Sequence, residues 1–139
     1  MRKLLLPVDG STRVRPAIEY VMRHRGDEDV QIHLLNVQPP VRARELWHFL
    51  DFDGILEARQ AAGEDVLREA REEVRRAGFD AVASVCIGAP AETIMNYASR
   101  QRCESIVMGA ARPRVARLLE GSVSRSVARH ARIPVTVIP

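Results

Sequence analysis

The chain has 139 residues, of which 46% are apolar and 28% are charged, and its formal net charge is +3. This balance excludes a disordered chain and fits one globular domain spanning residues 1–139. No apolar run approaches the ~18 residues of a membrane-spanning helix. The apolar stretch after Lys3 is too short for a signal peptide, so we expect a cytoplasmic protein with no membrane partner.

Five short apolar segments predict buried strands. The first, Leu4–Val8, is apolar throughout, as in a strand that is covered on both faces. The other four are expected at residues 30–37, 81–87, 105–108 and 133–138. Cys86 falls inside the third of the five strands and is expected to be a buried thiol. Neither Cys86 nor Cys103 has a partner spaced for metal or redox chemistry.

Apolar residues at helical spacing predict a helix between each pair of strands. The first helix has Ser11 or Thr12 as its expected cap and Gly26 after its end. The four helices are expected at about residues 14–22, from 57 to 77, from 90 onward and from 121 to 131. The less regular residues 41–56 contain the only tryptophan, Trp47. We interpret them as an amphipathic excursion that covers the domain or faces a partner.

Strands that alternate with helices predict an α/β fold with a parallel sheet and helices on both faces. In such sheets, ligands bind beyond the carboxyl ends of the strands, where the strand order reverses. The predicted crevice lies among Asp9, Val37 and the segment from Met108 to Ser122. In that segment, an arginine-rich turn leads to Gly121–Ser122 at the expected start of a helix, which is a layout that can hold a phosphate.

Several classes of protein are disfavoured by what the sequence lacks. It has no Walker A motif, no dinucleotide-binding glycine pattern after the first strand and no G-x-S-x-G nucleophile motif. Its four histidines lie far apart, which disfavours a metal centre, and the sequence offers no obvious second carboxylate or base to act with Asp9 in catalysis. Residues 101–139 are arginine-rich but contain no aromatic side chain on which nucleic-acid bases could stack. A protein that binds a small phosphate-bearing molecule fits better than an enzyme.

Five segments, in register along the whole chain, resemble the universal stress protein family. They are Leu6–Ser11 after an apolar start, Gly88–Ile94, Ile106–Gly109, Gly121–Val123 and the closing His130–Ile138. Only the segment around residues 39–60 is unmatched, and this segment varies in the family. The resemblance implies a Rossmann-like five-stranded parallel sheet of order 3-2-1-4-5, as in adenine nucleotide alpha hydrolase-like proteins. It also implies a cytoplasmic stress-response protein, often dimeric.

One branch of this family binds ATP through a G-x2-G-x9-G-[ST] motif, and another branch lacks the motif. This sequence keeps Gly109 and the pair Gly121–Ser122, but Arg112 replaces the second glycine, and eight residues instead of nine precede Gly121. Arg112 and Pro113 disfavour the backbone geometry of a phosphate loop, whereas arginines can replace lost backbone contacts. Two alternatives stay open: a loop that binds ATP, with Mg²⁺ only alongside it, or a nucleotide-independent dimeric regulatory protein.

The resemblance also assigns roles to individual residues. Asp9 is expected to hydrogen-bond the ligand, and the Val37 backbone is expected to meet the adenine base. The implied nucleotide-binding set is Pro7, Asp9, Val37, Met108, Gly109, Arg112, Gly121, Ser122 and Val123. No catalytic residue is implied, and the most activity that we expect is weak ATP hydrolysis.

The last predicted strand, Ile133–Ile138, is expected at an edge of the sheet. Pro134 lacks a backbone N–H, which suits an edge position. An exposed apolar edge is usually covered, so we expect a homodimer with Val135 and Val137 at its interface, through a two-fold axis. Dimerisation through this strand is also what the family resemblance implies. The alternatives are an edge left to solvent or covered by residues 41–56.

Overall fold

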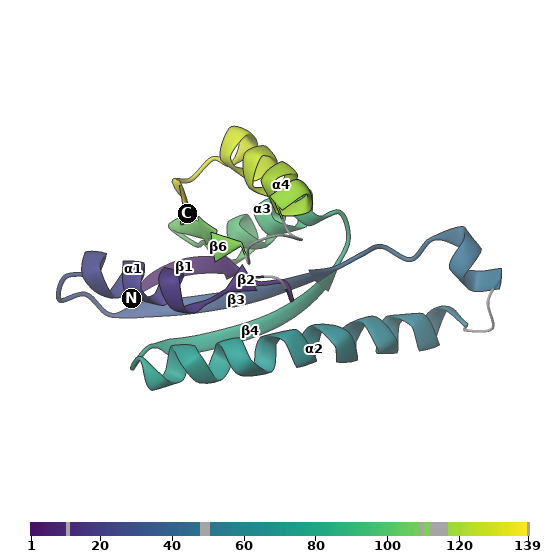
Figure 1. Ribbon diagram of the computed structural model, residues 1–139, viewed down its shortest axis with the longest axis horizontal. Coiled ribbons are helices and arrows are strands. Elements are labelled where there is room, and N and C mark those ends of the chain that lie inside the picture. Colours follow the sequence, from purple (N-terminus) through teal and green to yellow (C-terminus); the bar gives the residue numbers. More distant parts are fainter. Residues whose placement is uncertain (11, 48–50, 109, 112–116, 139) are drawn as a thin grey trace.

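A computed structural model of the chain describes residues 1–10, 12–47, 51–108, 110–111 and 117–138 (Figure 1). Its main feature is a five-stranded sheet in the order β4-β3-β1-β5-β7, in which every neighbouring pair is parallel. The strands are β1 (Arg2–Pro7), β3 (Val30–Gln38), β4 (Asp80–Ile87), β5 (Ser105–Met108) and β7 (Val135–Val137). Counted along this sheet, the order is the predicted 3-2-1-4-5, so the predicted fold is confirmed.

Two layers of helices cover the sheet (Figure 1). Helices α1 (Arg15–His24) and α2 (Phe52–Arg76) pack on one face, and α3 (Pro90–Gln101) and α4 (Arg117–His130) pack on the other. A short 3₁₀ helix, η1 (Ala43–Trp47), precedes α2. In the described part of the chain, no helix is both long enough and apolar enough to span a membrane.

Alternation along the central strand β1 explains why Leu4, Leu5 and Leu6 form a continuous apolar run. Leu4 and Leu6 point into the cluster under α1 and α2, whereas Leu5 points into the cluster under α3 and α4. All three side chains are at most 7% exposed. A continuous apolar run is therefore what a strand covered on both faces requires.

The start of α2 differs from the prediction. We expected the helix to begin near Glu57, but it begins at Phe52. The Asp51 carboxylate accepts a hydrogen bond from the backbone N–H of Gly54 at 2.6 Å and so caps the first turn. The first turns of α2 and the 3₁₀ helix η1 project beyond the sheet (Figure 1). We call this projection, residues 39–47 and 51–59, the arm.

The start of α4 is a second correction. We expected Gly121–Ser122 to open the helix, but α4 begins at Arg117. The first helix differs as well, because its N-cap position is Val14, which makes no side-chain capping hydrogen bond. Thr12 lies instead in a short strand, β2 (Thr12–Arg13), and Ser11 lies outside the described residues.

Strand β2 pairs antiparallel with β6 (Ala110–Ala111), and this two-stranded ladder was not predicted. A further correction concerns the thiols. Cys103 is the buried one, at 5% exposed, and Cys86 is only partly buried. Cys103 follows Arg102, the left-handed residue that ends α3, and its backbone N–H donates to the Ala98 carbonyl at 2.9 Å, which holds it in the core.

Candidate functional site

The carboxyl ends of β3, β1 and β5 lie side by side at one edge of the sheet. Because the three strands are parallel and Pro7 pairs with Leu35, the residues that follow β1 lie next to Val37. Met108 ends β5 on the other side of β1. The structure therefore brings four predicted site residues to one edge: Pro7, Asp9, Val37 and Met108.

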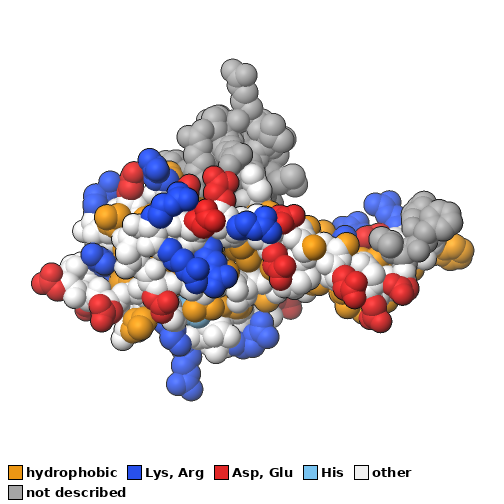
Figure 2. Space-filling model, turned by 90° about the horizontal axis from the view of Figure 1, so that it is seen from below, with side chains coloured by type: hydrophobic (Ala, Val, Ile, Leu, Met, Phe, Trp, Pro, Cys, Tyr) orange, Lys and Arg blue, Asp and Glu red, His pale blue; other side chains and the backbone are white. Residues whose placement is uncertain are grey.

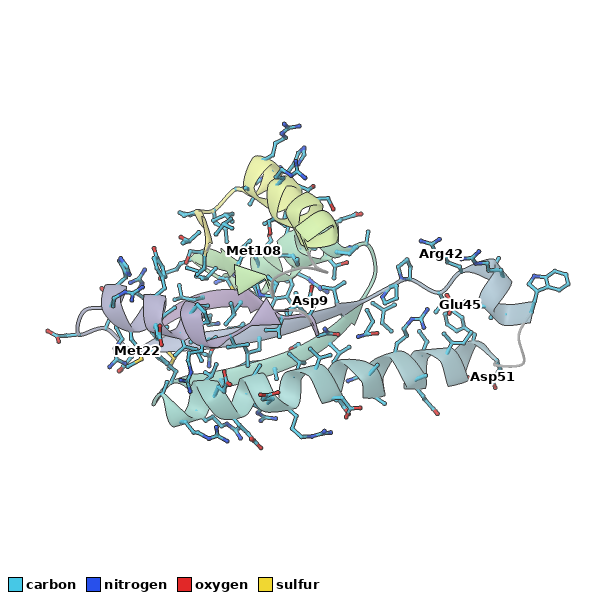
Figure 3. All side chains as sticks on the ribbon, viewed as in Figure 1. Asp9, Met22, Arg42, Glu45, Asp51 and Met108 are labelled. Carbon is cyan, nitrogen blue, oxygen red and sulfur yellow. The ribbon has the colours of Figure 1, made fainter. Side chains whose placement is uncertain are left out.

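Two of these residues form an apolar floor. Met108 is 8% exposed and Val37 is partly buried, and both pack in the cluster beneath α3 and α4. The Met108 carbonyl accepts the Ile138 N–H at 3.0 Å, which holds the end of β5 against the segment after β7. The carboxylate-bearing Asp9 is exposed just beyond β1, as Figure 3 shows.

A buried asparagine fixes the exit of β1. Asn36, 2% exposed, donates from its side-chain amide to the Val8 carbonyl at 2.8 Å. Its own amide oxygen accepts from the Gln38 side chain at 2.7 Å. The Val8 N–H donates to the Leu35 carbonyl at 2.8 Å. Both the N–H and the carbonyl of Val8, the residue before Asp9, are therefore hydrogen-bonded to β3. Asn36 was not among the predicted site residues, although a polar residue within the apolar run of β3 was the available signal.

Gly63 lets α2 lie close over Asn36. A Cβ atom at this glycine would stand 2.5 Å and 2.6 Å from the two Val85 methyl carbons and 3.0 Å from the Asn36 amide oxygen. Real Cβ atoms essentially never come within 3.0 Å of a neighbour. The glycine in the middle of α2 is therefore required by the packing of this helix against β3 and β4.

The segment expected to hold phosphates is only partly described. Gly109 and Arg112 lie outside the described residues. Gly121 is the fifth residue of α4, beyond the first turn, whose N–H groups have no partner within the helix. Ser122 is exposed, and Val123 is partly buried against the cluster beneath α3 and α4. The helix N-terminus that was expected at Gly121 therefore lies one turn earlier along the chain.

The β2–β6 ladder links the loops that follow β1 and β5. Thr12 pairs with Ala111, and Arg13 pairs with Ala110. Backbone groups committed to this ladder cannot also point at a phosphate. The ladder therefore occupies part of the backbone of the segment directly after Gly109.

A groove of about 310 Å³ lies on the opposite side of the sheet, between α2 and the loop after β1. It is lined by Val8, Asp9, Gly10, Val14, Arg15, Asp65, Val66, Glu69, Ala70 and Glu73. Of the predicted site residues, it contains Asp9. Its lining has four acidic side chains and one arginine, and one of the four acids, Asp65, is paired with Arg68 at 2.9 Å. We call it the acidic groove.

Two clear pKa shifts belong to a buried polar network. Burial lowers the pKa of His33 and raises the pKa of the Tyr97 hydroxyl. The His33 ring lies 3.0 Å from the Tyr97 oxygen through Nδ1 and 2.8 Å from the Gln31 amide oxygen through Nε2. This network ties β3 to α3, and its role is structural.

The strand order defines a doubly wound α/β protein in which the order reverses between β1 and β5, the position at which sheets of this class bind their ligands. The model of the universal stress protein family matches residues 1–139. The chain belongs to this family.

Comparisons with individual relatives support this family assignment. The universal stress protein MJ0531 of Methanocaldococcus jannaschii is 25% identical over 143 residues, which cover 99% of this chain and 81% of that protein. The solved structure of the protein MJ0577 superposes with a TM-score of 0.76 at 24% identity, covering 99% of this chain and 94% of that one. A universal stress protein family member from Arabidopsis thaliana, At3g01520, was solved with AMP bound. It gives a TM-score of 0.69 at 24% identity and covers 99% and 91% of the two chains.

Proposed function

We propose that this stress protein binds an adenine nucleotide at the carboxyl ends of β1 and β5, without catalysing a reaction on it. The observation that carries the proposal is the juxtaposition of Asp9, Val37 and Met108 at the switch point of the sheet. An Arabidopsis member of the family with the same fold was solved with AMP bound, which supports an adenylate as the ligand.

In this proposal the base lies against the backbone of Val37, with Pro7 beside it. Asp9 accepts hydrogen bonds from the ligand, and Met108 forms the floor. The phosphate end lies toward α4, on the same face of the sheet as Val37 and Met108. Gly109, Arg112, Gly121, Ser122 and Val123 are the proposed phosphate contacts.

We infer the number of phosphates on the preferred nucleotide from the altered loop after β5. ATP needs a continuous row of backbone donors, whereas the ladder uses part of the backbone of Ala110–Ala111. The loop is also one residue shorter than the family motif. AMP needs donors for one phosphate only. We therefore propose that AMP binds at least as tightly as ATP, and that Mg²⁺ has a role only when ATP is bound.

Calorimetric titration with AMP, ADP and ATP tests this function. Asp9→Ala and Ser122→Ala are expected to weaken binding, and the exposed positions Asp27→Ala and Ser99→Ala serve as matched controls. No heat from any of the three nucleotides at millimolar concentration would falsify the proposal. ATP binding far more tightly than AMP would overturn the preference for one phosphate.

A second candidate function is a nucleotide-independent dimeric regulatory protein. The observation in its favour is that β7 is an edge strand, paired with β5 alone in the described sheet, and Val137 is 51% exposed. We propose a homodimer through this edge, compatible with either function. The absorbance ratio at 260 and 280 nm of freshly purified protein separates the two, because retained nucleotide raises it well above that of one tryptophan and two tyrosines.

A further inference from the structure

Strand β4 forms the edge of the sheet opposite β7. Within the described part of the chain it pairs with β3 alone, and it is eight residues long, whereas β7 has three. Of its eight residues only Ala81 is buried, and Asp80 at its start is the only charged one. A long and nearly uncharged edge that other elements leave open is a place where a further strand can pair.

The hydrogen bonds to β3 show which backbone groups of β4 point outward. The Gly88 N–H donates to the Gln38 carbonyl at 3.0 Å, so the backbone of Gly88 is turned toward β3. In a parallel ladder every second residue bonds to the same neighbour, so the backbones of Val82, Ser84 and Cys86 are turned toward β3 as well. The outward N–H and carbonyl groups therefore belong to the intervening residues Ala81, Ala83, Val85 and Ile87.

These outward groups are symmetric about Ser84. A second β4 strand that lies antiparallel, with a two-fold axis at Ser84, pairs Ala81 with Ile87 of the other copy and Ala83 with Val85. Every outward N–H and carbonyl group of these four residues then has a partner. Any other register leaves some of these groups without one.

The side chains fit this register. Each alanine of the outward set lies opposite a larger β-branched residue, so the contacts on the α2 face interdigitate. Asp80 falls opposite Gly88, which has no side chain, so no like charges meet along the two strands. On the α3 face, Ser84 lies opposite Ser84 of the other copy, and Val82 lies opposite Cys86.

The helices leave room for this pairing. Gly63 of α2 lies close to both Val85 of β4 and Asn36 of β3, so the helix lies above the boundary between the two strands. With strands ~4.8 Å apart, the α2 helices of two copies come to lie roughly 10 Å apart, a usual spacing of packed helices. On the other face, an open groove of about 600 Å³ separates α3 from the end of β4. Arg100 is the one charged residue among those that line this groove, and its exposed side chain can turn into water.

The exposed charges on the β4 side of α2 change sign along the helix. Asp65, Glu69 and Glu73 line the acidic groove, on the side of α1, so the opposite flank of the helix faces the open edge. At helical spacing, this flank carries the exposed residues Glu57, Glu64, Arg68, Arg71 and Arg75. Figure 2 looks onto the side of the molecule that α2 covers and shows side chains of both signs along it.

Antiparallel pairing brings opposite charges together. Helix α2 runs antiparallel to β4, and Gly63 lies over Val85. One strand residue of ~3.3 Å spans about two helix residues of ~1.5 Å, so the axis at Ser84 is level with the point at which the flank changes sign. The axis therefore places Glu57 of one copy near Arg75 of the other, once on each side.

We propose that β4 pairs antiparallel with β4 of a second copy of this chain, about a two-fold axis at Ser84, with Glu57 and Arg75 of the two α2 helices facing each other. This association is separate from the proposed β7 dimer, because β4 and β7 lie at opposite edges of the sheet. It uses none of the residues proposed to contact the nucleotide. A chain that pairs at both edges assembles into tetramers or longer arrays.

Amide hydrogen exchange tests the pairing directly. In the Val137→Lys background, which places a charge at the β7 edge, exchange is followed by NMR from tens of micromolar to millimolar protein, with sedimentation in parallel. The N–H groups of Ala83 and Val85 are expected to become protected as dimers form, whereas that of Ser84, which faces β3, is protected at every concentration. A protein that stays monomeric at millimolar concentration would overturn the proposal. Dimers in which Ala83 and Val85 exchange as in the monomer would overturn it as well.

Disulfide cross-linking tests the register. Residues directly opposite each other at a non-hydrogen-bonded position lie close enough for a disulfide. In a Cys86→Ser background, Ser84→Cys is expected to form covalent dimers with oxidised glutathione. Ala83→Cys in the same background is the control, because position 83 faces Val85 of the other copy and not itself. Covalent dimers of the control but not of Ser84→Cys would overturn the axis at Ser84.

A second variant guards against damage at position 84, because the Ser84 hydroxyl lies 3.2 Å from that of Tyr97. Val82→Cys keeps Ser84 and places a thiol opposite the native Cys86 of the other copy. Covalent dimers are expected, and they should disappear when Cys86→Ser is added. If neither Val82→Cys nor Ser84→Cys cross-links at a protein concentration that gives dimers, the proposed pairing is wrong.

Charge reversal tests the contact between the helices. Glu57→Arg and Arg75→Glu are each expected to weaken association by roughly threefold to tenfold, and the double variant is expected to recover it. Within one chain these positions lie roughly 27 Å apart along α2, so recovery can arise only between copies. Arg129→Glu, at an exposed position on α4, is the control. A double variant that associates no better than the single ones would contradict the antiparallel arrangement.

Discussion

Asn36 and Val8 are joined by a buried hydrogen bond of 2.8 Å from the asparagine amide to the valine carbonyl. The bond lies one residue before Asp9, the side chain proposed to meet the nucleotide. Without Asn36, the Val8 carbonyl would lose this side-chain donor at the point where the chain leaves β1. The position of Asp9 therefore depends on a residue of the neighbouring strand.

Replacing Asn36 is expected to affect both stability and binding. Asn36→Ala leaves the buried Val8 carbonyl without this donor, at a cost of about 1–3 kcal/mol in the free energy of unfolding. Because the exit of β1 loosens, AMP affinity should fall as well. Urea unfolding and calorimetry measure the two effects, with Asn96→Ala on the exposed side of α3 as the control. Unaltered stability and AMP affinity in Asn36→Ala would contradict this role.

Gly63→Ala is expected to have two opposing effects on stability, one from packing and one from helix propensity. Alanine in a helix interior is favoured over glycine by ~1 kcal/mol, but its Cβ would meet the Val85 methyl groups at 2.5 Å and 2.6 Å. Overpacking costs about 1–3 kcal/mol, so a net loss of stability is expected. Adding Val85→Ala should recover most of the loss. A Gly63→Ala protein more stable than the parent would show that α2 can move away from the sheet.

The buried histidine predicts a pH dependence of stability. Burial lowers the pKa of His33 below its ordinary value of 6.5, so the unfolded chain binds a proton that the folded chain does not. Stability is therefore complete above pH 6.5 and falls as the pH decreases below it, toward the lowered pKa, by at most ~1.4 kcal/mol per pH unit. Lys3 also lowers this pKa, and Asp80 opposes the shift.

Urea midpoints between pH 8 and pH 5 measure this slope. A His33→Gln variant should lose the His33 part of the slope, whereas His24→Gln, at an exposed position, should keep it. The hydrogen-bond chain also fixes the histidine tautomer. Gln31 donates to the Asp80 carboxylate at 2.8 Å and so turns its oxygen toward His33. Nε2 therefore carries the proton and Nδ1 accepts from Tyr97, which nitrogen NMR shifts of the ring can check.

The proposed β7 dimer is tested by one exposed position. Val137 is 51% exposed on the edge strand, so Val137→Lys should leave the core intact and place a charge at the interface. Light scattering at tens of micromolar is expected to show dimers for the parent and a shift toward monomers for the variant. An equivalent change on α1, Met22→Lys, also at an exposed position, is the control. A monomeric parent, or a variant as dimeric as the parent, would contradict the β7 interface.

The strands were predictable because burial on both faces leaves a simple apolar run in the sequence. Helix starts were less predictable, because each depends on which nearby side chain caps the backbone N–H groups of the first turn. Asp51 caps α2 from within an irregular stretch. Gly121–Ser122 has the composition of a helix start, yet lies inside α4.

The candidate site was predictable only in part. Parallel strands bring their carboxyl ends together, so the positions of Asp9, Val37 and Met108 followed from topology. Asn36 and Gly63 matter through contacts between β3, β4 and α2, which no local pattern records. The β2–β6 ladder joins residues about a hundred positions apart in two-residue strands, too short for any alternation to be visible.

The most direct test of the central claim locates AMP on the protein by NMR. Backbone amide shifts are followed during titration with AMP, in the parent and in Asp9→Ala. We predict saturable shifts clustered at residues 8–10, 36–38, 107–109 and 121–124, strongly weakened in the variant. The absence of shifts, or shifts confined to residues 65–73 of α2, would contradict a nucleotide site between the carboxyl ends of β1 and β5.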